Sequence, residues 1–215
     1  MRIVCISDTH KFHEQIVVPD GDVLIHSGDA TVNGTIPEIA DFIEWLSQQP
    51  HQHKILVAGN HDWLYFLDNP LARELTKPSV IYLQDSLTEI DGLKIYGSPW
   101  QPRFFDWAFN LNRGPEMAEK WAMIPDDIDI LITHGPPHGI LDLVPRQGWE
   151  ENTGCEELRK RVEQIAAHGR MKLHVFGHIH CGYGVHEEFG VKFVNASTCD
   201  EQYNATNPPI VIDLD

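Results

Sequence analysis

One pattern, repeated five times, constrains the fold more than any other feature: a short apolar segment rich in β-branched residues runs directly into polar residues. Such segments are typical of the buried strands of an α/β sheet, each ending where a loop begins. The five segments span residues 2–7, 22–26, 54–58, 129–133 and 172–176. Aspartate, histidine or asparagine follows each of them, so every predicted strand ends in a potential ligand.

Two amphipathic helices are predicted between these strands, over residues 36–46 and 155–167, because apolar residues recur there at helical spacing. Thr35 is placed to cap the first helix, and Pro37 lies in its first turn. Gly169 stands where the second helix would stop.

Further strands are predicted outside the repeated pattern. Asp91 and Gly92 separate two apolar runs, which is typical of a hairpin with a two-residue turn. Residues 185–194, around Gly190, and residues 210–214 also have the character of strands. We therefore expect an α/β fold with mixed sheets, and 215 residues predict a single domain, residues 1–215.

Residues 99–125 form a different kind of segment, with aromatic side chains among prolines, glycines and polar residues. The aromatic residues are Trp100, Phe104, Phe105, Trp107, Phe109 and Trp121. Packing of a small core under a long connection is the favoured interpretation. The alternative is contact with a ligand, including base stacking by a nuclease that acts on short single strands.

Charge and cysteine usage limit the partners and the compartment. A net charge of −16 without a lysine or arginine cluster opposes binding of long nucleic acid. The four cysteines form no C-x-x-C pair, which suits a reducing compartment. No apolar run is long enough for a signal-peptide core or a membrane span, so we expect a cytoplasmic protein without a membrane partner.

The polar residues at the strand ends have the character of metal ligands. Asp8 and His10 are two residues apart, as are His178 and His180. In extended backbone the members of each pair would project from one face, so we expect each pair to reach one metal ion. The carboxyl ends of strands are a common ligand-binding edge in α/β sheets. Seven candidate ligands result: Asp8, His10, Asp29, Asn60, His134, His178 and His180.

Seven ligands exceed what one metal ion needs. A tetrahedral site takes about four, whereas two cations roughly 3.5–4 Å apart would use the whole set. Asp29 is the predicted bridge because a bridging group needs two oxygens and negative charge, while Asn60 offers a neutral carbonyl oxygen. Nitrogen and oxygen ligands without thiolate suit manganese, iron, zinc or cobalt, and we favour manganese.

These residues also carry a family resemblance. The chain resembles the calcineurin-like metallophosphoesterases in five motifs with matching order and spacing: Asp8-Thr9-His10, Gly28-Asp29, Gly59-Asn60-His61-Asp62, His134 and Gly177-His178-Ile179-His180. Residues 96–100, 110–114, 133–137 and 178–184 resemble the metallophosphoesterase-domain-containing subgroup. The resemblance implies a sandwich of two mixed sheets flanked by helices, a dinuclear metal site, and activity on phosphodiesters, with cyclic nucleotides among the candidate substrates.

Motif positions within the resemblance also imply individual roles. One metal ion would take Asp8, His10, Asp29 and His180, and the other would take Asp29, Asn60, His134 and His178. His61 would stay unligated beside the scissile phosphate, where it would stabilise or protonate the leaving oxygen. Asn60 and His61 are therefore the predicted catalytic and substrate-binding residues.

The chain departs from the family pattern after Gly28-Asp29. Many members carry a further acid and an arginine there, whereas this chain continues with Ala30, Thr31, Val32 and Asn33. Another group must therefore hold His61, and the missing arginine counts against the protein Ser/Thr phosphatase branch. Arg103 or Arg113 would be a substitute for that arginine, unless both are ordinary solvated side chains.

The mechanism that these residues predict is attack on phosphorus by hydroxide formed from a water that bridges the two ions. Asn60 and His61 would stabilise the developing charge. A phosphodiesterase acting on a small phosphate ester, with nucleotides among the candidates, is the favoured function. A phosphomonoesterase with the same centre is one alternative. A non-catalytic metal-dependent sensor of phosphate or nucleotide is another, although no ligand position has been lost.

Overall fold

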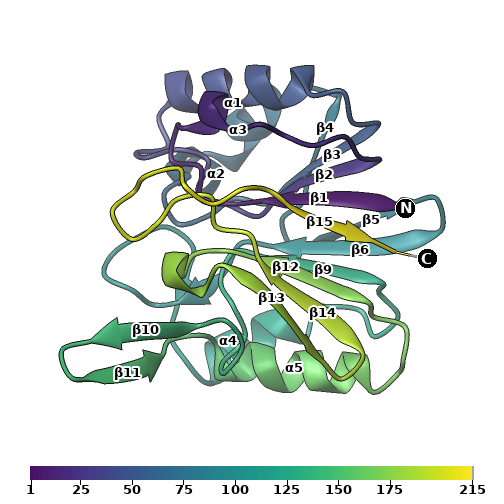
Figure 1. Ribbon diagram of the computed structural model, residues 1–215, viewed down its shortest axis with the longest axis vertical. Helices are drawn as coiled ribbons and strands as arrows, with labels where there is room; N and C mark the ends of the chain where they lie inside the picture. The colour runs from purple at the N-terminus through teal and green to yellow at the C-terminus, as the bar shows by residue number, and fades with distance from the viewer. Residues whose placement is uncertain (215) are drawn as a thin grey trace.

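Two mixed β-sheets pack face to face, and helices cover the outer face of each sheet (Figure 1). The computed structural model describes residues 1–214. The predicted α/β sandwich flanked by helices is confirmed.

The first sheet has the strand order β15-β1-β2-β3-β4. Its strands are β1 (Arg2–Ile6), β2 (Val23–His26), β3 (His53–Leu56), β4 (Val80–Tyr82) and β15 (Ile210–Asp213). β1 to β4 run parallel, and β15 lies antiparallel to β1. All of these strands except β4 were predicted from the sequence, and β4 is only three residues long.

The second sheet has the order β13-β14-β12-β9-β6-β5. Its strands are β5 (Ser86–Ile90), β6 (Leu93–Ser98), β9 (Ile130–Thr133), β12 (Leu173–Phe176), β13 (Gly184–Glu188) and β14 (Val191–Asn195). Its four inner strands are parallel and its two edge strands are antiparallel. The predicted hairpin turn is confirmed, since Asp91 and Gly92 both have positive φ, at 49° and 82°.

Helices lie outside both sheets. They are α1 (Ile36–Gln48), α2 (Trp63–Leu67) and α3 (Asn69–Leu75) against the first sheet, and α4 (Pro115–Trp121) and α5 (Glu156–Ala166) against the second. Thr35 and Glu38 form a capping box at the start of α1. Gly169 adopts a φ of 75° shortly after α5 ends, which confirms its predicted position. The three short helices were not predicted, because five to seven residues show too little periodicity.

Strand alternation divides the core into three layers. In β1, Ile3 and Cys5 face the second sheet, whereas Val4 and Ile6 face α1. A third layer joins the second sheet to α4 and α5 around Trp121. Because both faces of the inner strands are buried, these strands have continuous apolar sequences.

The aromatic segment 99–125 contains β7 (Gln101–Pro102), β8 (Asn110–Leu111) and α4. Phe109 and Trp121 are buried, which agrees with the packing interpretation for those two side chains. Phe104 and Phe105 are exposed at 47% and 73%, so packing does not account for them. A hairpin outside both sheets, β10 (Leu143–Arg146) and β11 (Trp149–Asn152), was not predicted.

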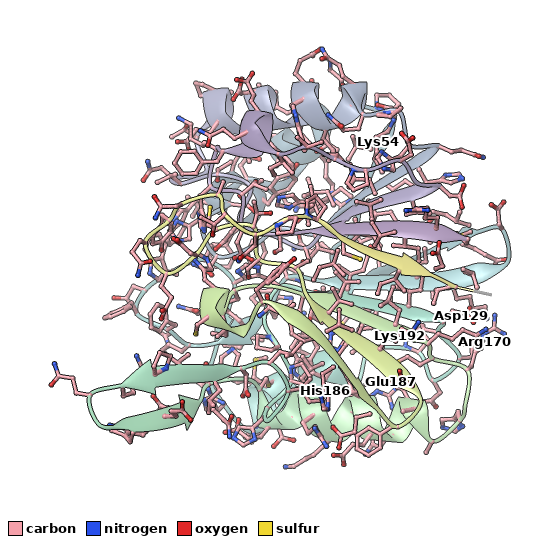
Figure 2. All side chains as sticks on the ribbon, in the orientation of Figure 1. Lys54, Asp129, Arg170, His186, Glu187 and Lys192 are labelled. Atoms are coloured by element: carbon pink, nitrogen blue, oxygen red, sulfur yellow. The ribbon has the colours of Figure 1, made fainter. Side chains whose placement is uncertain are left out.

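In both sheets, an aspartate at the amino end of one strand accepts a backbone hydrogen bond from the neighbouring strand. Asp22 precedes β2 and its carboxylate accepts the backbone N–H of Arg2 at 2.7 Å. Asp129 precedes β9 and accepts the N–H of Lys94, also at 2.7 Å. Arg170 adds an ion pair of 2.9 Å to the buried Asp129, and Figure 2 shows the two side chains next to each other. Carboxylates at this end of the fold are therefore neutralised or bonded by the protein itself.

Candidate metal centre

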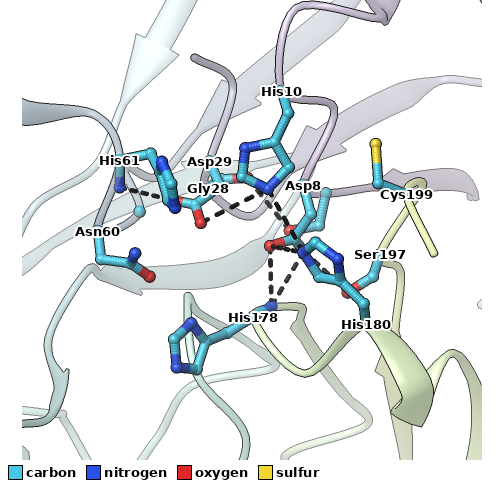
Figure 3. A network of polar contacts seen from close by, with 12 residues as sticks. Asp8, His10, Gly28, Asp29, Asn60, His61, His178, His180, Ser197 and Cys199 are labelled. Carbon is cyan, nitrogen blue, oxygen red and sulfur yellow. Dashed lines mark hydrogen bonds and ion pairs between the residues drawn. The ribbon is translucent and has the colours of Figure 1, made fainter. Parts of the chain in front are cut away.

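All seven predicted ligands, together with His61, come together at the carboxyl ends of strands from both sheets. Figure 3 labels all of them except His134. β1 leads into Asp8 and His10, β2 into Asp29, β3 into Asn60 and His61, β9 into His134, and β12 into His178 and His180. Parallel strands point their carboxyl ends the same way, so residues far apart in the sequence share one edge.

The ligand atoms form three overlapping groups, within each of which they lie less than 4.8 Å apart. The groups are Asp8 with His10 and His180, His10 with Asp29 and His61, and Asp29 with His134 and His178. Asn60 adjoins the third group, with Oδ1 2.9 Å from Nε2 of His134. Asp29 belongs to two groups, as a carboxylate shared by two cations would.

The backbone of the paired ligands differs from the prediction. Asp8, His10 and His178 have φ values of 49°, 40° and 68°, so the expectation of extended backbone is wrong. His178 and His180 consequently fall in different groups rather than side by side on one face. The chain turns as soon as each strand ends, and the left-handed conformation costs about 1–2 kcal/mol for a residue with a Cβ. Hydrogen bonds hold these residues in place: the N–H of Asp8 donates to the carbonyl of Gly28 at 2.8 Å, and the N–H of His10 to that of Asp29 at 3.0 Å.

Four imidazoles are held in one tautomer by backbone carbonyls. The Nδ1 atoms of His10, His61, His134 and His180 lie 3.1, 2.7, 3.0 and 2.9 Å from the carbonyl oxygens of Thr31, Val32, Ser27 and Asp200. Because a carbonyl oxygen only accepts, Nδ1 carries the hydrogen in each ring. In its neutral form each ring then presents the Nε2 lone pair, as metal-bound histidines do.

Acceptor atoms face one another across the centre. Nε2 of His10 lies 3.4 Å from Nε2 of His180, and Nε2 of His134 lies 3.4 Å from Oδ2 of Asp29. Two lone pairs at this distance repel unless a proton or a cation lies between them. The donor set, with nitrogens and carboxylate oxygens turned inward, therefore fits divalent metal ions.

The pKa shifts show how strongly the centre attracts positive charge. Burial alone would lower the pKa of His134, but the Asp29 carboxylate outweighs burial and raises this pKa to about 9. For His180, Asp8 likewise outweighs burial and raises the pKa to about 9. Burial lowers the pKa of His178 to about 3, which keeps that ring neutral and available as a ligand.

The two carboxylates are ionised and fixed in place. Burial would raise their pKa values, but His180 beside Asp8 and His134 beside Asp29 hold both values below the usual range. Asp29 Oδ1 accepts the backbone N–H of His61 at 2.7 Å. Asp8 accepts the N–H of His178 at 3.0 Å and the hydroxyl of Ser197 at 2.9 Å.

Sequence reasoning missed Ser197. It follows β14, so the pattern of an apolar strand running into polar residues continues at a sixth strand end and would have revealed it. Tyr203 was also missed: its ring centroid lies 4.8 Å from that of His10 and 5.2 Å from that of His180. No local motif marks Tyr203, because the fold alone brings it to the centre.

His61 is held by the segment in which the family acid is missing. The carbonyl oxygen of Val32 bonds to its Nδ1, and the ring of Trp107 lies against the imidazole with centroids 4.1 Å apart. A backbone carbonyl therefore orients His61. Asp62 supports the same loop by accepting the N–H of Gly59 at 2.8 Å and the hydroxyl of Thr31 at 2.8 Å.

Two glycines permit the close approach of the loops. A Cβ at Gly59 would lie 2.3 Å from Asp29, and a Cβ at Gly177 would lie 2.0 Å from Oδ2 of Asp8. Both distances are far below van der Waals contact. The centre leaves no room for a side chain at either position.

Two further observations concern the whole chain. Within residues 1–214, no helix combines the length and the apolar character needed to cross a bilayer. The four cysteines Cys5, Cys155, Cys181 and Cys199 are free thiols.

Comparison with known proteins places the chain in a family. The model of the calcineurin-like phosphoesterase family matches residues 1–182. Metallophosphoesterase domain-containing protein 1 of Homo sapiens and that of Mus musculus are each 46% identical, over 99% of this chain and 71% of theirs. UPF0046 protein K07C11.7 of Caenorhabditis elegans is 39% identical, over 98% of this chain and 74% of its own. The chain therefore belongs to the calcineurin-like phosphoesterases, a family of metal-dependent hydrolases.

Proposed function

We propose that the chain is a phosphodiesterase that holds two divalent cations and hydrolyses a small organic phosphodiester, nucleotides being candidate substrates. The observation that carries the proposal is the convergence of two buried carboxylates with imidazole Nε2 atoms that face one another. Asp8, His10, Asp29 and His180 would hold one cation, and Asp29, Asn60, His134 and His178 would hold the other. Manganese is our favoured metal.

Bound cations would neutralise phosphate oxygens and acidify water for attack on phosphorus. The chain's own residues position the phosphate and manage the protons. In the imidazolium form of His61, Nδ1–H stays on the Val32 carbonyl and Nε2–H faces the leaving oxygen. Water that has given one proton to solvent forms the new P–O bond as hydroxide, the ester P–O bond breaks, and the leaving oxygen takes the His61 proton.

Asn60 contributes both ends of its amide in this proposal. Its Oδ1 lies beside Nε2 of His134, at the position of a ligand atom. The amide N–H groups then remain for a phosphate oxygen, where a fixed donor stabilises the developing charge.

A pocket supports the choice of diester over monoester. It has a volume of about 280 Å³ and shares His178 with the proposed centre. When the leaving arm of a diester lies beside His61, its second arm is available to this space, whereas a monoester in the same position has no second arm. A cytoplasmic location is also part of the proposal, since four free thiols suit a reducing compartment.

The test begins with protein stripped of metal by a chelator and reloaded with manganese. We expect elemental analysis to find two equivalents of metal, and loaded protein to hydrolyse bis(p-nitrophenyl) phosphate faster than p-nitrophenyl phosphate. Equal rates with and without metal would refute the proposed role of the cations. A large preference for the monoester would identify a phosphomonoesterase, and tight nucleotide binding without turnover would identify a sensor.

A further inference from the structure

The pocket beside His178 has walls from three separate parts of the chain. The segment after β7 contributes Arg103 and Phe104, the loop after β9 contributes Pro136, and the β10–β11 hairpin contributes Val144 and Arg146. Because His178 belongs both to the pocket and to a ligand group, the pocket adjoins the candidate centre.

One wall of the pocket suits an aromatic group. The ring of Phe104 is 47% exposed and lies edge-on to His178, with centroids 6.1 Å apart. Pro136, Ile179 and Val144 supply further apolar surface. An exposed phenylalanine among such residues offers an edge or face to a flat ring.

The charge of the pocket contrasts with that of the chain. Three arginines, Arg103, Arg113 and Arg146, and one acid, Glu151, line it in a chain of net charge −16. The acids paired with Arg103 and Arg113, Asp106 and Glu156, lie outside the lining. Three arginines in one small pocket of so acidic a protein favour an anionic occupant.

The three arginines differ in what they already bind. Arg113 donates to the carbonyls of Thr153 and Gly154 at 2.7 Å and to Glu156 at 2.5 Å, so it fixes a wall of the pocket.

The other two arginines have donors to spare. Arg103 contacts Asp106 at 3.2 Å, and Arg146 contacts Glu151 at 3.0 Å. Both guanidiniums are about half exposed and have five N–H donors each, more than one carboxylate uses. Arg103 and Arg146 are therefore the groups available to an incoming anion.

We infer that this pocket binds one ester arm of the substrate, and that this arm has an aromatic body and a negative charge. The inference rests on the proposed phosphodiesterase function. The volume of about 280 Å³ lies below the roughly 300–1,000 Å³ of pockets that enclose a whole ligand, so one arm fills it while the phosphate stays at the centre.

Three p-nitrophenyl phosphodiesters test the inference, with methyl, phenyl or 4-carboxyphenyl as the second arm. With manganese-loaded protein we expect kcat/KM to rise in that order. The double variant Arg103→Gln/Arg146→Gln should lower kcat/KM for the carboxyphenyl diester about tenfold more than for the phenyl diester, because only the former loses charged hydrogen bonds to its arm. Phe104→Ala should lower kcat/KM for the two diaryl esters more than for the methyl ester.

Lys77→Gln is the matched control, since Lys77 is a half-exposed cation paired with Glu44, outside the pocket. It should leave all three rates unchanged. Equal kcat/KM for the three arms in the parent protein would overturn the inference while the phosphodiesterase function stands. So would a double variant that loses the same factor in kcat/KM on the carboxyphenyl and phenyl diesters.

A second readout separates failure of the pocket from failure of the function. If the loaded parent protein hydrolyses none of the diesters, the proposed function is wrong. Calorimetric titration with phenyl 4-carboxyphenyl phosphate then still decides the inference. About tenfold weaker binding by the double variant supports the pocket, and equal binding by the two proteins, or no binding by the parent, rejects it.

Discussion

The two sheets match at the amino ends of their strands and differ at the carboxyl ends. Asp22 in the first sheet and Asp129 in the second make the same 2.7 Å bond to a neighbouring strand. At the other end, the first sheet supplies both carboxylates and the amide of the candidate centre, whereas β9 and β12 of the second sheet supply only imidazoles. The amino ends of the two sheets thus share one structural hydrogen bond. At the carboxyl ends, the sheets contribute different ligand types to the candidate metal centre.

Because the ligand types are divided in this way, neither sheet alone could form the candidate metal centre. The acids of the first sheet pair with histidines, Asp8 with His180 and Asp29 with His134, whereas Asp129 pairs with Arg170. The acids of the first sheet raise the pKa values of His134 and His180 in the loops of the second sheet. The contrast predicts that metal ions join the sheets at the carboxyl ends, while protein bonds alone suffice at the amino ends.

The largest effect should come from exchanging one carboxylate at each end of the sandwich. Asp29→Asn should lower kcat by roughly 10³-fold, because residues that act as one unit lose most activity when one is removed. Asp129→Asn should keep metal content and kcat but lower the free energy of unfolding by about 1–3 kcal/mol, because it weakens a buried bond. Phosphodiesterase assays, elemental analysis and urea unfolding of both variants measure this contrast. Full activity and metal content in Asp29→Asn would remove the basis of the comparison.

A pair of histidine variants separates proton transfer from metal binding. His61→Asn, in the first sheet's loop, should retain both metal ions and lose about 10²-fold in kcat on alkyl phosphodiesters, because the leaving alcohol lacks its acid. The loss should be smaller with p-nitrophenyl esters, whose leaving group needs no proton. His178→Asn, from the second sheet, should lose metal. Metal analysis and rates on both ester types check this, and an equal loss on both types would count against an acid role for His61.

Removing the metal ions should weaken the joint between the sheets. Metal present at about 100 times its dissociation constant stabilises the fold by about 2.7 kcal/mol. For a protein of this size, a chelator should therefore lower the melting temperature by about 5–10 °C. The melting temperature of Asp29→Asn should change little when the chelator is added, because this variant already lacks the bridging carboxylate. A calorimetric scan with and without chelator provides the measurement. An unchanged melting temperature in the parent protein would contradict the claim that metal ions hold the two sheets together.

The acids of the first sheet also predict how metal affinity depends on pH. In metal-free protein, His134 and His180 have pKa values raised to about 9, so both hold protons at pH 7 and must release them to bind metal. Metal affinity should rise with pH between 7 and 9, by about tenfold per pH unit for each proton released. Titration calorimetry in buffers of different ionisation enthalpy counts those protons. If metal binding took up protons, or exchanged none, the raised pKa values of His134 and His180 would be contradicted.

The smallest effect should come from a hydroxyl that reaches from one sheet to the acid of the other. Ser197→Ala removes the 2.9 Å bond to Asp8 and should weaken metal binding about tenfold, as loss of a ligand's supporting bond does. Ser47→Ala, at a half-buried serine in α1, is the control. Competition with a metal-sensitive dye compares the two variants. Equal affinities would mean that Asp8 is oriented by the His178 N–H alone.

Much of this arrangement was readable in the sequence. Buried strands have continuous apolar sequences, so β1, β2, β3, β9 and β12 were predicted together with the residues that follow them. The capping residue Thr35 and the turn at Asp91-Gly92 were predicted for a similar reason, since each acts on its immediate neighbours. Features that depend on adjacent positions are therefore accessible without a structure.

The missing parts depend on contacts between distant residues. The separation of His178 from His180 follows from left-handed backbone that no spacing reveals. The carbonyl of Val32 orients His61 without any side-chain signature. Tyr203 reaches the centre only because the last loop folds back over it. Contacts made by backbone groups, and by loops that fold back over the centre, could not be predicted from the sequence. These contacts nevertheless determine how the ligand side chains are oriented.

The contact between Trp107 and His61 gives the centre an optical signal of its own. Their ring centroids lie 4.1 Å apart at an interplanar angle of 30°. An imidazolium at that distance quenches the fluorescence of an excited indole more strongly than a neutral ring does. Emission from Trp107, isolated by replacing the other five tryptophans with phenylalanine, would therefore report the protonation of His61 in real time.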